Sequence, residues 1–283
     1  MNSAGTLEKI PTAERFRREL TAKRVAIGII VAVAGIGSIF NQYMFAIVIA
    51  AITLIGSVEF SNLARRAGWQ VSLPIALAAC AAYPTLAFFG LLGRYESALV
   101  VGIILASFVA ALPANSSLFD GRVAMTVLGC LYLGKLLSYM ILLRALPHGA
   151  RLVLWLVIIV VLTDTVGMIA GLGFGHRPLA PRLSPGKSWE GAIAALVVAS
   201  LAGFALWWPL GVPGPWWIAL AFPLCVSVAA EFGDLVESAI KRNAQVKDSG
   251  HVFAGHGGVL DRFDSYIFAG VIGYALLLFA GVR

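Results

Sequence analysis

Long apolar stretches dominate this chain and restrict what it can fold into. A helix that crosses a bilayer needs roughly 20 mostly apolar residues, and about nine stretches qualify. They comprise residues 25–41, 43–60, 72–92, 96–113, 122–144, 151–172, 191–210, 215–238 and 263–281. Backbone polar groups find no partners in hydrocarbon, so such segments must be helices or a closed barrel. Because the runs are continuous rather than alternating, the sequence predicts an all-α, polytopic transmembrane helix bundle.

Composition excludes the main alternatives. Of 283 residues, 60% are hydrophobic and 12% are charged, whereas a soluble domain carries roughly 25% charged residues. This excludes a soluble enzyme, a disordered chain and a disulfide scaffold. The 3 cysteines form no CxxC motif, so neither a cysteine zinc site nor a disulfide framework is expected.

The positions of Lys and Arg predict the orientation. If the basic first 24 residues are cytoplasmic, the basic residues of the later polar loops are cytoplasmic as well. The few basic residues then left outside are Arg94, Arg144, Arg151 and Arg283. Cytoplasmic loops carry an excess of Lys and Arg, so we expect a multi-pass protein of the cell (inner) membrane with its N-terminus in the cytoplasm. The net charge of +7 is thereby attributed to topology, and no nucleic-acid partner is expected.

Three regions follow from this topology. Residues 1–24 are expected to form a cytosolic basic amphipathic segment on the membrane surface, or else a loose basic tail. Residues 25–150 are expected to form N-terminal transmembrane helices. Residues 151–283 form a further transmembrane region, expected to be catalytic, in which the polar loops 173–190 and 241–262 face the cytosol.

Acidic residues are concentrated in one short window. Of the 14 in the chain, six fall between residues 231 and 264: Glu231, Asp234, Glu237, Asp248, Asp261 and Asp264. A carboxylate inside a membrane domain is costly and usually faces a bundle interior or a wet cavity. This window is therefore the candidate functional site.

The spacing of these residues indicates shared helix faces. Asp234, Ser238 and Lys241 lie at positions i, i+4 and i+7, while Asp261 and Asp264 are separated by three residues at the start of the last helix. Carboxylates from two helices can bind a divalent cation, and oxygen ligands suit Mg²⁺. The alternative is that they are helix-end charges, which an N-terminus favours.

A glycine-rich loop separates the two helices and contains Gly255, His256, Gly257 and Gly258. Basic residues flank it: Lys241, Arg242, Lys247 and Arg262. Consecutive backbone N–H groups and nearby cations can bind an anion, so the loop is interpreted as a polyphosphate cradle. His256 would contact a phosphate or relay a proton, or would be an ordinary loop histidine.

The other polar loop offers Ser184, Lys187, Ser188 and Glu190. Lys187 would add a phosphate contact, whereas the serines and Glu190 also fit a capped helix start. Asp164 lies within an apolar stretch and must face a polar cavity or find a partner, for which Lys135 is one candidate.

The segment from Ser238 to Asp264, SAIKRNAQVKDSGHVFAGHGGVLDRFD, closely resembles the C-terminal signature of the phosphatidate cytidylyltransferase (CDP-diacylglycerol synthase) family. Asp164-Thr165, Phe174-Gly175 and the stretch from Ser184 to Gly191 are also similar to that family. The chain departs from it in having Ala254 at a position that is usually another small turn residue, such as proline. It departs again where Met168, Leu172 and Gly173 replace aromatic and basic residues. By motif, the resemblance covers residues 160–270.

The resemblance implies the reaction of CTP with phosphatidate to give CDP-diacylglycerol and pyrophosphate, at a Mg²⁺-dependent site facing the cytoplasm. It implies that Asp234, Asp261 and Asp264 are the metal carboxylates, with a second, monovalent cation such as K⁺ nearby. It also implies a homodimer in contact with membrane lipid. Further candidates for the cavity are Asp164, Glu190, Asp248 and Ser238.

Other functions remain open at this point. A catalytically altered relative would bind nucleotide without turnover. A membrane transporter would place charges near the midplane in both halves of the chain, whereas here they cluster at one end. A CDP-alcohol phosphotransferase would carry a DGxxAR motif, which is absent.

Overall fold

The computed structural model describes residues 33–112, 121–250 and 257–282. Within them, seven helical segments are long and apolar enough to cross a membrane. These are α3 (Gln42–Arg66), α5 (Leu92–Ala111), the continuous segment Arg122–Ala145, α8 (Gly149–Phe174), α9 (Trp189–Trp207), α10 (Ile218–Asn243) and α11 (Leu260–Phe279). A further apolar helix, α4 (Leu73–Phe88), has only 16 residues and contains Pro84.

The helix bundle is confirmed, but the predicted count of about nine spans is not. Helix α4 is shorter than the roughly 20 residues that a span needs. Residues 25–32 of the predicted stretch 25–41 lie outside the described residues, as does the whole of the predicted segment 1–24.

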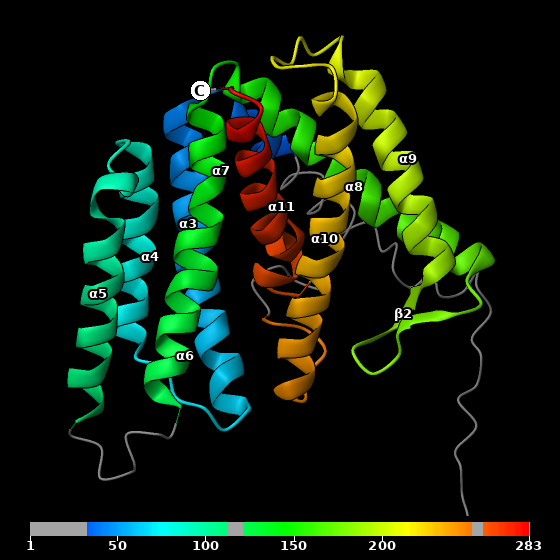
Figure 1. The fold of residues 1–283 in the computed structure, drawn as a ribbon. Helices are drawn as coiled ribbons and strands as arrows, with labels where there is room; N and C mark the ends of the chain where they lie inside the picture. The colour runs from blue at the N-terminus through cyan, green and yellow to red at the C-terminus, as the bar shows by residue number, and fades with distance from the viewer. Residues whose placement is uncertain (1–32, 113–120, 251–256, 283) are drawn as a thin grey trace, which may run out of the picture.

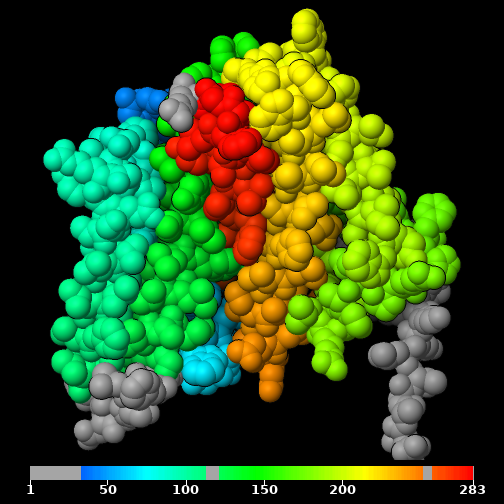
Figure 2. All heavy atoms as spheres, in the orientation of Figure 1, coloured from blue at the N-terminus to red at the C-terminus, as the bar shows by residue number. Residues whose placement is uncertain are grey.

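Helices α10 and α11 pack against each other at the centre of the bundle (Figure 1). Helix α8 crosses the bundle obliquely and packs on α9, while α3 packs on α4. In the space-filling view α5 and α9 form the two edges of this face (Figure 2). Of the apolar 18-residue stretch within α5, only 17% is buried, against 61% of the corresponding stretch within Arg122–Ala145. The edge helices therefore expose apolar surface of the kind that lipid covers.

One end of the bundle gathers several helix ends. Helices α3 and α10 end there, and α4 and α6 (Arg122–Gly129) begin there, at the lower end of the view in Figure 1. Arg65 and Arg66 form the last turn of α3, and Lys241 and Arg242 lie in the last turn of α10. Basic residues from distant parts of the sequence thus share one end of the molecule.

The loop 173–190 is more ordered than an all-α fold predicts. It contains a two-stranded antiparallel hairpin of β1 (Pro178–Ala180) and β2 (Ser184–Ser188). Ser188 ends the hairpin and caps α9, because its Oγ accepts a hydrogen bond of 3.1 Å from the Gly191 N–H. The Glu190 carboxylate accepts hydrogen bonds from the N–H groups of His176 and Arg177. The hairpin is thus fixed to the start of α9.

The segment Arg122–Ala145 contains a π-helical stretch, η1 (Cys130–Lys135), followed by α7 (Leu136–Ala145). Lys135, at the end of η1, forms an ion pair with Glu96 of α5. The suggested pairing of Lys135 with Asp164 is therefore wrong, because Glu96 supplies the nearer counter-charge.

An aromatic pair locks α8 to its neighbours. Trp155 of α8 and Phe222 of α10 are fully buried and stacked, with ring centroids 4.2 Å apart. The Trp155 indole N–H also donates a hydrogen bond of 2.8 Å to the Gly203 carbonyl of α9. Because three helices meet at one side chain, α8, α9 and α10 are held as a unit.

Candidate functional site

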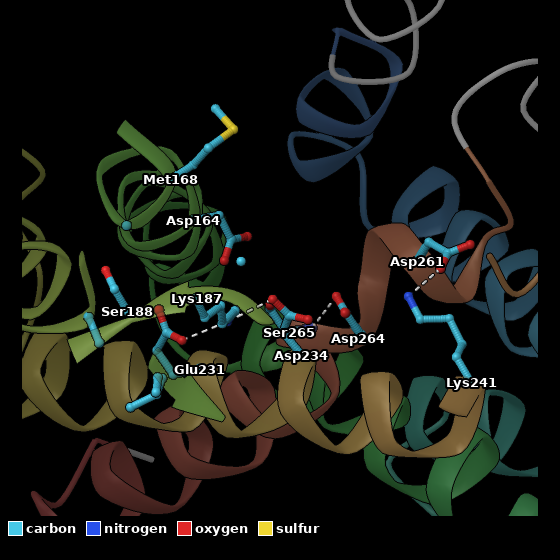
Figure 3. Close-up of a pocket in the computed structure, with 14 residues that line it drawn as sticks. Asp164, Met168, Lys187, Ser188, Glu231, Asp234, Lys241, Asp261, Asp264 and Ser265 are labelled. Atoms are coloured by element: carbon cyan, nitrogen blue, oxygen red, sulfur yellow. Dashed lines mark hydrogen bonds and ion pairs between the residues drawn. The ribbon is translucent and has the colours of Figure 1, made fainter. Parts of the chain in front are cut away.

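A cavity of about 340 Å³ lies between α8, β2, α10 and α11. Figure 3 shows Asp164, Lys187, Glu231, Asp234 and Asp264 directed toward it, with the pair of Lys241 and Asp261 to one side. Its lining residues are Asp164, Gly167, Met168, Leu179, Gly186, Lys187, Ser188, Ala192, Glu231, Asp234, Lys241, Asp261, Asp264 and Ser265. Most of the charged ones fall in the window that the sequence singled out.

Three carboxylates converge beside this cavity. One oxygen each from Asp234 and Glu237 of α10 and Asp264 of α11 lie within 4.8 Å of one another. Glu237 is fully buried, and its Oε1 accepts no hydrogen bond from the residues that the structure describes. Oxygen-only ligands in this number suit a hard divalent cation, which would also satisfy the free Glu237 oxygen.

A glycine makes this convergence sterically feasible. Gly233 precedes Asp234 on α10, and a Cβ at Gly233 would lie 2.5 Å from the Asp264 carbonyl oxygen. Helix α11 therefore approaches the α10 backbone at the level of the carboxylates, closer than any larger residue allows.

Lys187 brings the hairpin to the carboxylates of α10. Its Nζ lies 2.6 Å from Glu231 Oε2 and 2.7 Å from Asp234 Oδ2. Burial alone lowers the pKa of Lys187, but the charges of Asp234 and Glu231 outweigh burial and raise that pKa above its ordinary value. Lys187 thus stays protonated at neutral pH and brings a positive charge to the cavity wall.

Asp261 is not one of the three clustered carboxylates, although it shares Lys241 with Glu237. Its Oδ1 pairs with Lys241 at 2.7 Å, and its Oδ2 accepts hydrogen bonds from Gly258 N–H and from both the N–H and the hydroxyl of Ser249. Both oxygens are thus occupied within the protein. The geometry favours Glu237 over Asp261 as the third member of a metal site, and the role of Asp261 as a metal ligand stays a prediction.

Several other predicted residues lie at or beside the cavity. Asp164 lines it from α8, and Ser188 lines it while capping α9. The Ser238 hydroxyl donates a hydrogen bond of 3.3 Å to Asp234 Oδ1, so Ser238 supports a cluster carboxylate.

The remaining predicted residues do not line this cavity: Ser184, Glu190, Arg242, Lys247, Asp248, Gly257, Gly258 and Arg262. Arg242 instead donates to the carbonyls of Leu183 and Val246, which ties the end of α10 to the hairpin. Lys247 and Asp248 line a separate groove beside Arg65 and Arg66 of α3. Gly255 and His256 lie outside the described residues.

The glycine-rich loop has a different arrangement from a simple phosphate cradle. The Gly258 N–H donates to Asp261 at 2.7 Å, and the next two N–H groups, of Val259 and Leu260, donate to Glu59 at 2.9 Å. These donors are thus already used by carboxylates of the chain itself.

Sequence reasoning did not assign roles to Glu231, Glu237, Ser265 and Glu59. Glu231 and Glu237 lie three residues before and after Asp234, so helical spacing already placed them near its face. Glu59 is far away in the sequence, and no local pattern marked it.

Comparison with known proteins identifies relatives of the chain. The model of the cytidylyltransferase family matches residues 21–280. The phosphatidate cytidylyltransferase of Helicobacter pylori is 34% identical over 84% of each chain. That of Bacillus subtilis is 35% identical over 66% of this chain and 69% of its own length. The chloroplastic phosphatidate cytidylyltransferase 5 of Arabidopsis thaliana is 29% identical over 97% of this chain and 75% of its own.

Proposed function

The chain belongs to the cytidylyltransferase family, and from this we propose that it converts CTP and phosphatidate to CDP-diacylglycerol and pyrophosphate. The observation that carries the proposal is the convergence of Asp234, Glu237 and Asp264 beside a cavity that Lys187 also lines. Acidic groups that can hold a metal, combined with a cation on the same wall, suit substrates that carry several phosphates.

In this reaction an oxygen of the phosphatidate phosphate attacks the α-phosphorus of CTP. A new P–O bond forms, the bond from the α-phosphorus to the oxygen that bridges to the β-phosphorus breaks, and pyrophosphate leaves. An ionised phosphate is already nucleophilic, so no general base is required. The side chains mainly position the substrates and neutralise charge, a role for which Lys187 and Lys241 are placed on the cavity wall.

The donor set fits Mg²⁺. Asp234, Glu237 and Asp264 offer carboxylate oxygens within 4.8 Å of one another, and Glu237 Oε1 has no hydrogen-bond donor among the described residues. Bound there, Mg²⁺ would neutralise phosphate oxygens and orient the polyphosphate. A monovalent cation such as K⁺ near the same carboxylates is part of the proposal and rests on the family resemblance.

We also propose a place for the site in the cell. The protein would be a multi-pass protein of the inner membrane with the cavity open to the cytoplasm, where CTP is available. The gathering of Arg65, Arg66, Lys241 and Arg242 at one end of the bundle supports this orientation. A homodimer rests on the family resemblance, and cross-linking in membranes would test it.

Purified protein supplied with radiolabelled CTP, phosphatidate and Mg²⁺ tests the proposal. We expect a labelled liponucleotide to form, and its formation should stop when a chelator is added and resume with excess Mg²⁺. An Asp264→Asn variant should fold and insert but form little product. Absence of product from the wild-type protein would favour a relative that binds nucleotide without turnover.

A further inference from the structure

Glu59 of α3 contacts the first turn of α11 from outside the cavity. Only 4% of Glu59 is exposed. Its Oε1 accepts a hydrogen bond from Val259 N–H and its Oε2 accepts one from Leu260 N–H, both at 2.9 Å. The first N–H groups of a helix have no partner within the helix and carry partial positive charge. Glu59 therefore caps α11 from a different transmembrane helix.

The same carboxylate is connected to Asp261 through Ser249. The Ser249 hydroxyl lies 2.8 Å from Asp261 Oδ2 and 3.2 Å from Glu59 Oε2. The Ser249 hydroxyl has a single hydrogen to donate to these two carboxylate oxygens. The shorter distance indicates that the stronger hydrogen bond is the one to Asp261. The contact joins α3, the segment after α10 and the start of α11 in a single polar network.

The backbone of that segment is packed directly against Glu59. A Cβ at Gly250 would lie 2.4 Å from Glu59 Oε1 and 2.9 Å from Glu59 Cδ. The three nearest atoms that it would meet all belong to Glu59. A shift of the Glu59 side chain would therefore shift the backbone at Gly250, and a shift of that backbone would displace Glu59.

We infer that Glu59 is a positioning residue for the carboxylate cluster. Leu260, which Glu59 holds, lies four residues before Asp264, about one helical turn along α11. Fixing the first turn of α11 fixes the height and rotation at which Asp264 meets Asp234 and Glu237. The consequence is that Glu59 sets the metal affinity of a site that it does not line. This consequence rests on the proposed function.

The test is Glu59→Gln in the full-length protein in detergent. Glutamine keeps the size of the side chain, but its NH₂ group is a donor and would face the Val259 or Leu260 N–H. Loss of a group that orients metal ligands typically costs about 10–100-fold in metal affinity or activity. We expect Mn²⁺ affinity, measured by electron paramagnetic resonance, to fall by about that factor. The Mg²⁺ concentration for half-maximal activity should rise in parallel, with the KM for CTP unchanged.

Two further variants sharpen the test. Glu59→Asp retains the charge and should recover part of the Mn²⁺ affinity. Glu96→Gln is the matched control, because it makes the same change in a membrane helix whose carboxylate pairs with Lys135. It should leave Mn²⁺ affinity unchanged.

A purely structural cap gives a different result. Glu59→Gln would then lower the unfolding temperature without changing Mn²⁺ affinity, which would overturn the inference. If Glu59→Gln does not fold, Gly250→Ala displaces the same carboxylate in an otherwise native chain, and unchanged Mn²⁺ affinity in that variant also overturns it. Wild-type protein that binds no Mn²⁺ overturns it as well. Wild-type protein that binds Mn²⁺ but forms no liponucleotide contradicts the proposed function and leaves the inference standing on the binding data.

Discussion

The Lys241 ammonium on α10 pairs with the Asp261 carboxylate on α11, with 2.7 Å between Nζ and Oδ1. The same ammonium pairs with Glu237, one turn earlier on α10. All three side chains are largely buried, so one cation neutralises carboxylates of both central helices. Removal of Lys241 would leave the two buried carboxylates without compensation, which is strongly destabilising, whereas removal of Glu237 would leave Lys241 paired with Asp261.

Lys241→Met should therefore impair both activity and stability. Loss of one preorganised charged group in a site typically costs about 100-fold or more in rate, and we expect a loss of transferase activity of this size. The unfolding temperature should also fall, and Mg²⁺ should raise it more in the variant than in the wild type, because the cation replaces part of the lost positive charge. Lys241→Arg, which keeps the charge, is the control. Wild-type activity and stability in Lys241→Met would contradict the role given to this ion pair.

Glu237→Gln tests whether the buried carboxylate binds the metal. A direct ligand should matter at least as much as a group that orients ligands, whose loss costs about 10–100-fold. We expect the Mg²⁺ requirement of the transferase reaction to rise by at least about 10-fold, as measured by metal titration. Removing a buried charge should at the same time preserve or increase the unfolding temperature without metal. A titration curve identical to that of the wild type would exclude Glu237 from the metal site.

Gly233→Ala tests the close approach of the two central helices. The added methyl group would lie 2.5 Å from the Asp264 carbonyl oxygen, where backbone cannot easily move away. Overpacking of this kind costs about 1–3 kcal/mol, and displacement of α11 should also reduce transferase activity. Gly173→Ala on α8 is the matched control, since its methyl group would meet no atom within 4 Å. Thermal unfolding and activity of the two variants should differ clearly, and equal behaviour would contradict this account.

The sequence predicted the elements of the site better than their pairing. Apolar runs identified the helices, because burial in lipid imposes length and composition on each segment separately. The acidic window identified α10 and α11 as the helices that carry the cluster. Helical spacing placed Asp261 and Asp264 on one face, yet Asp261 is directed to Ser249 and Lys241 whereas Asp264 meets Asp234. The direction of each carboxylate depends on which donors lie near it, here Ser249 and Lys241 for Asp261. Residue spacing along one helix does not reveal those donors.

Long-range contacts were beyond the sequence argument for the same reason. Glu59 is a single carboxylate in an apolar stretch, and its partners are backbone N–H groups that every residue type carries. The polyphosphate cradle in the glycine-rich loop stays a prediction, and the Gly258 N–H of that loop donates to the Asp261 carboxylate. Which anion it holds depends on the neighbouring helix, and no local motif specifies that.

The predicted orientation can be tested with single cysteines at opposite ends of α10. The native residues Cys80, Cys130 and Cys225 would first be replaced by alanine. Asn243 is exposed at the end of α10 beside the basic residues, and Pro209 is exposed in the turn before α10.

Because positive residues favour the cytoplasmic side, Asn243→Cys in intact cells should resist an impermeant maleimide and react after permeabilisation. Pro209→Cys should react from outside. Position 249 is unsuitable as a probe, since Ser249 is buried and hydrogen-bonded to Asp261. The reverse labelling pattern would place the cavity on the side away from CTP and would contradict the proposed reaction in the cell.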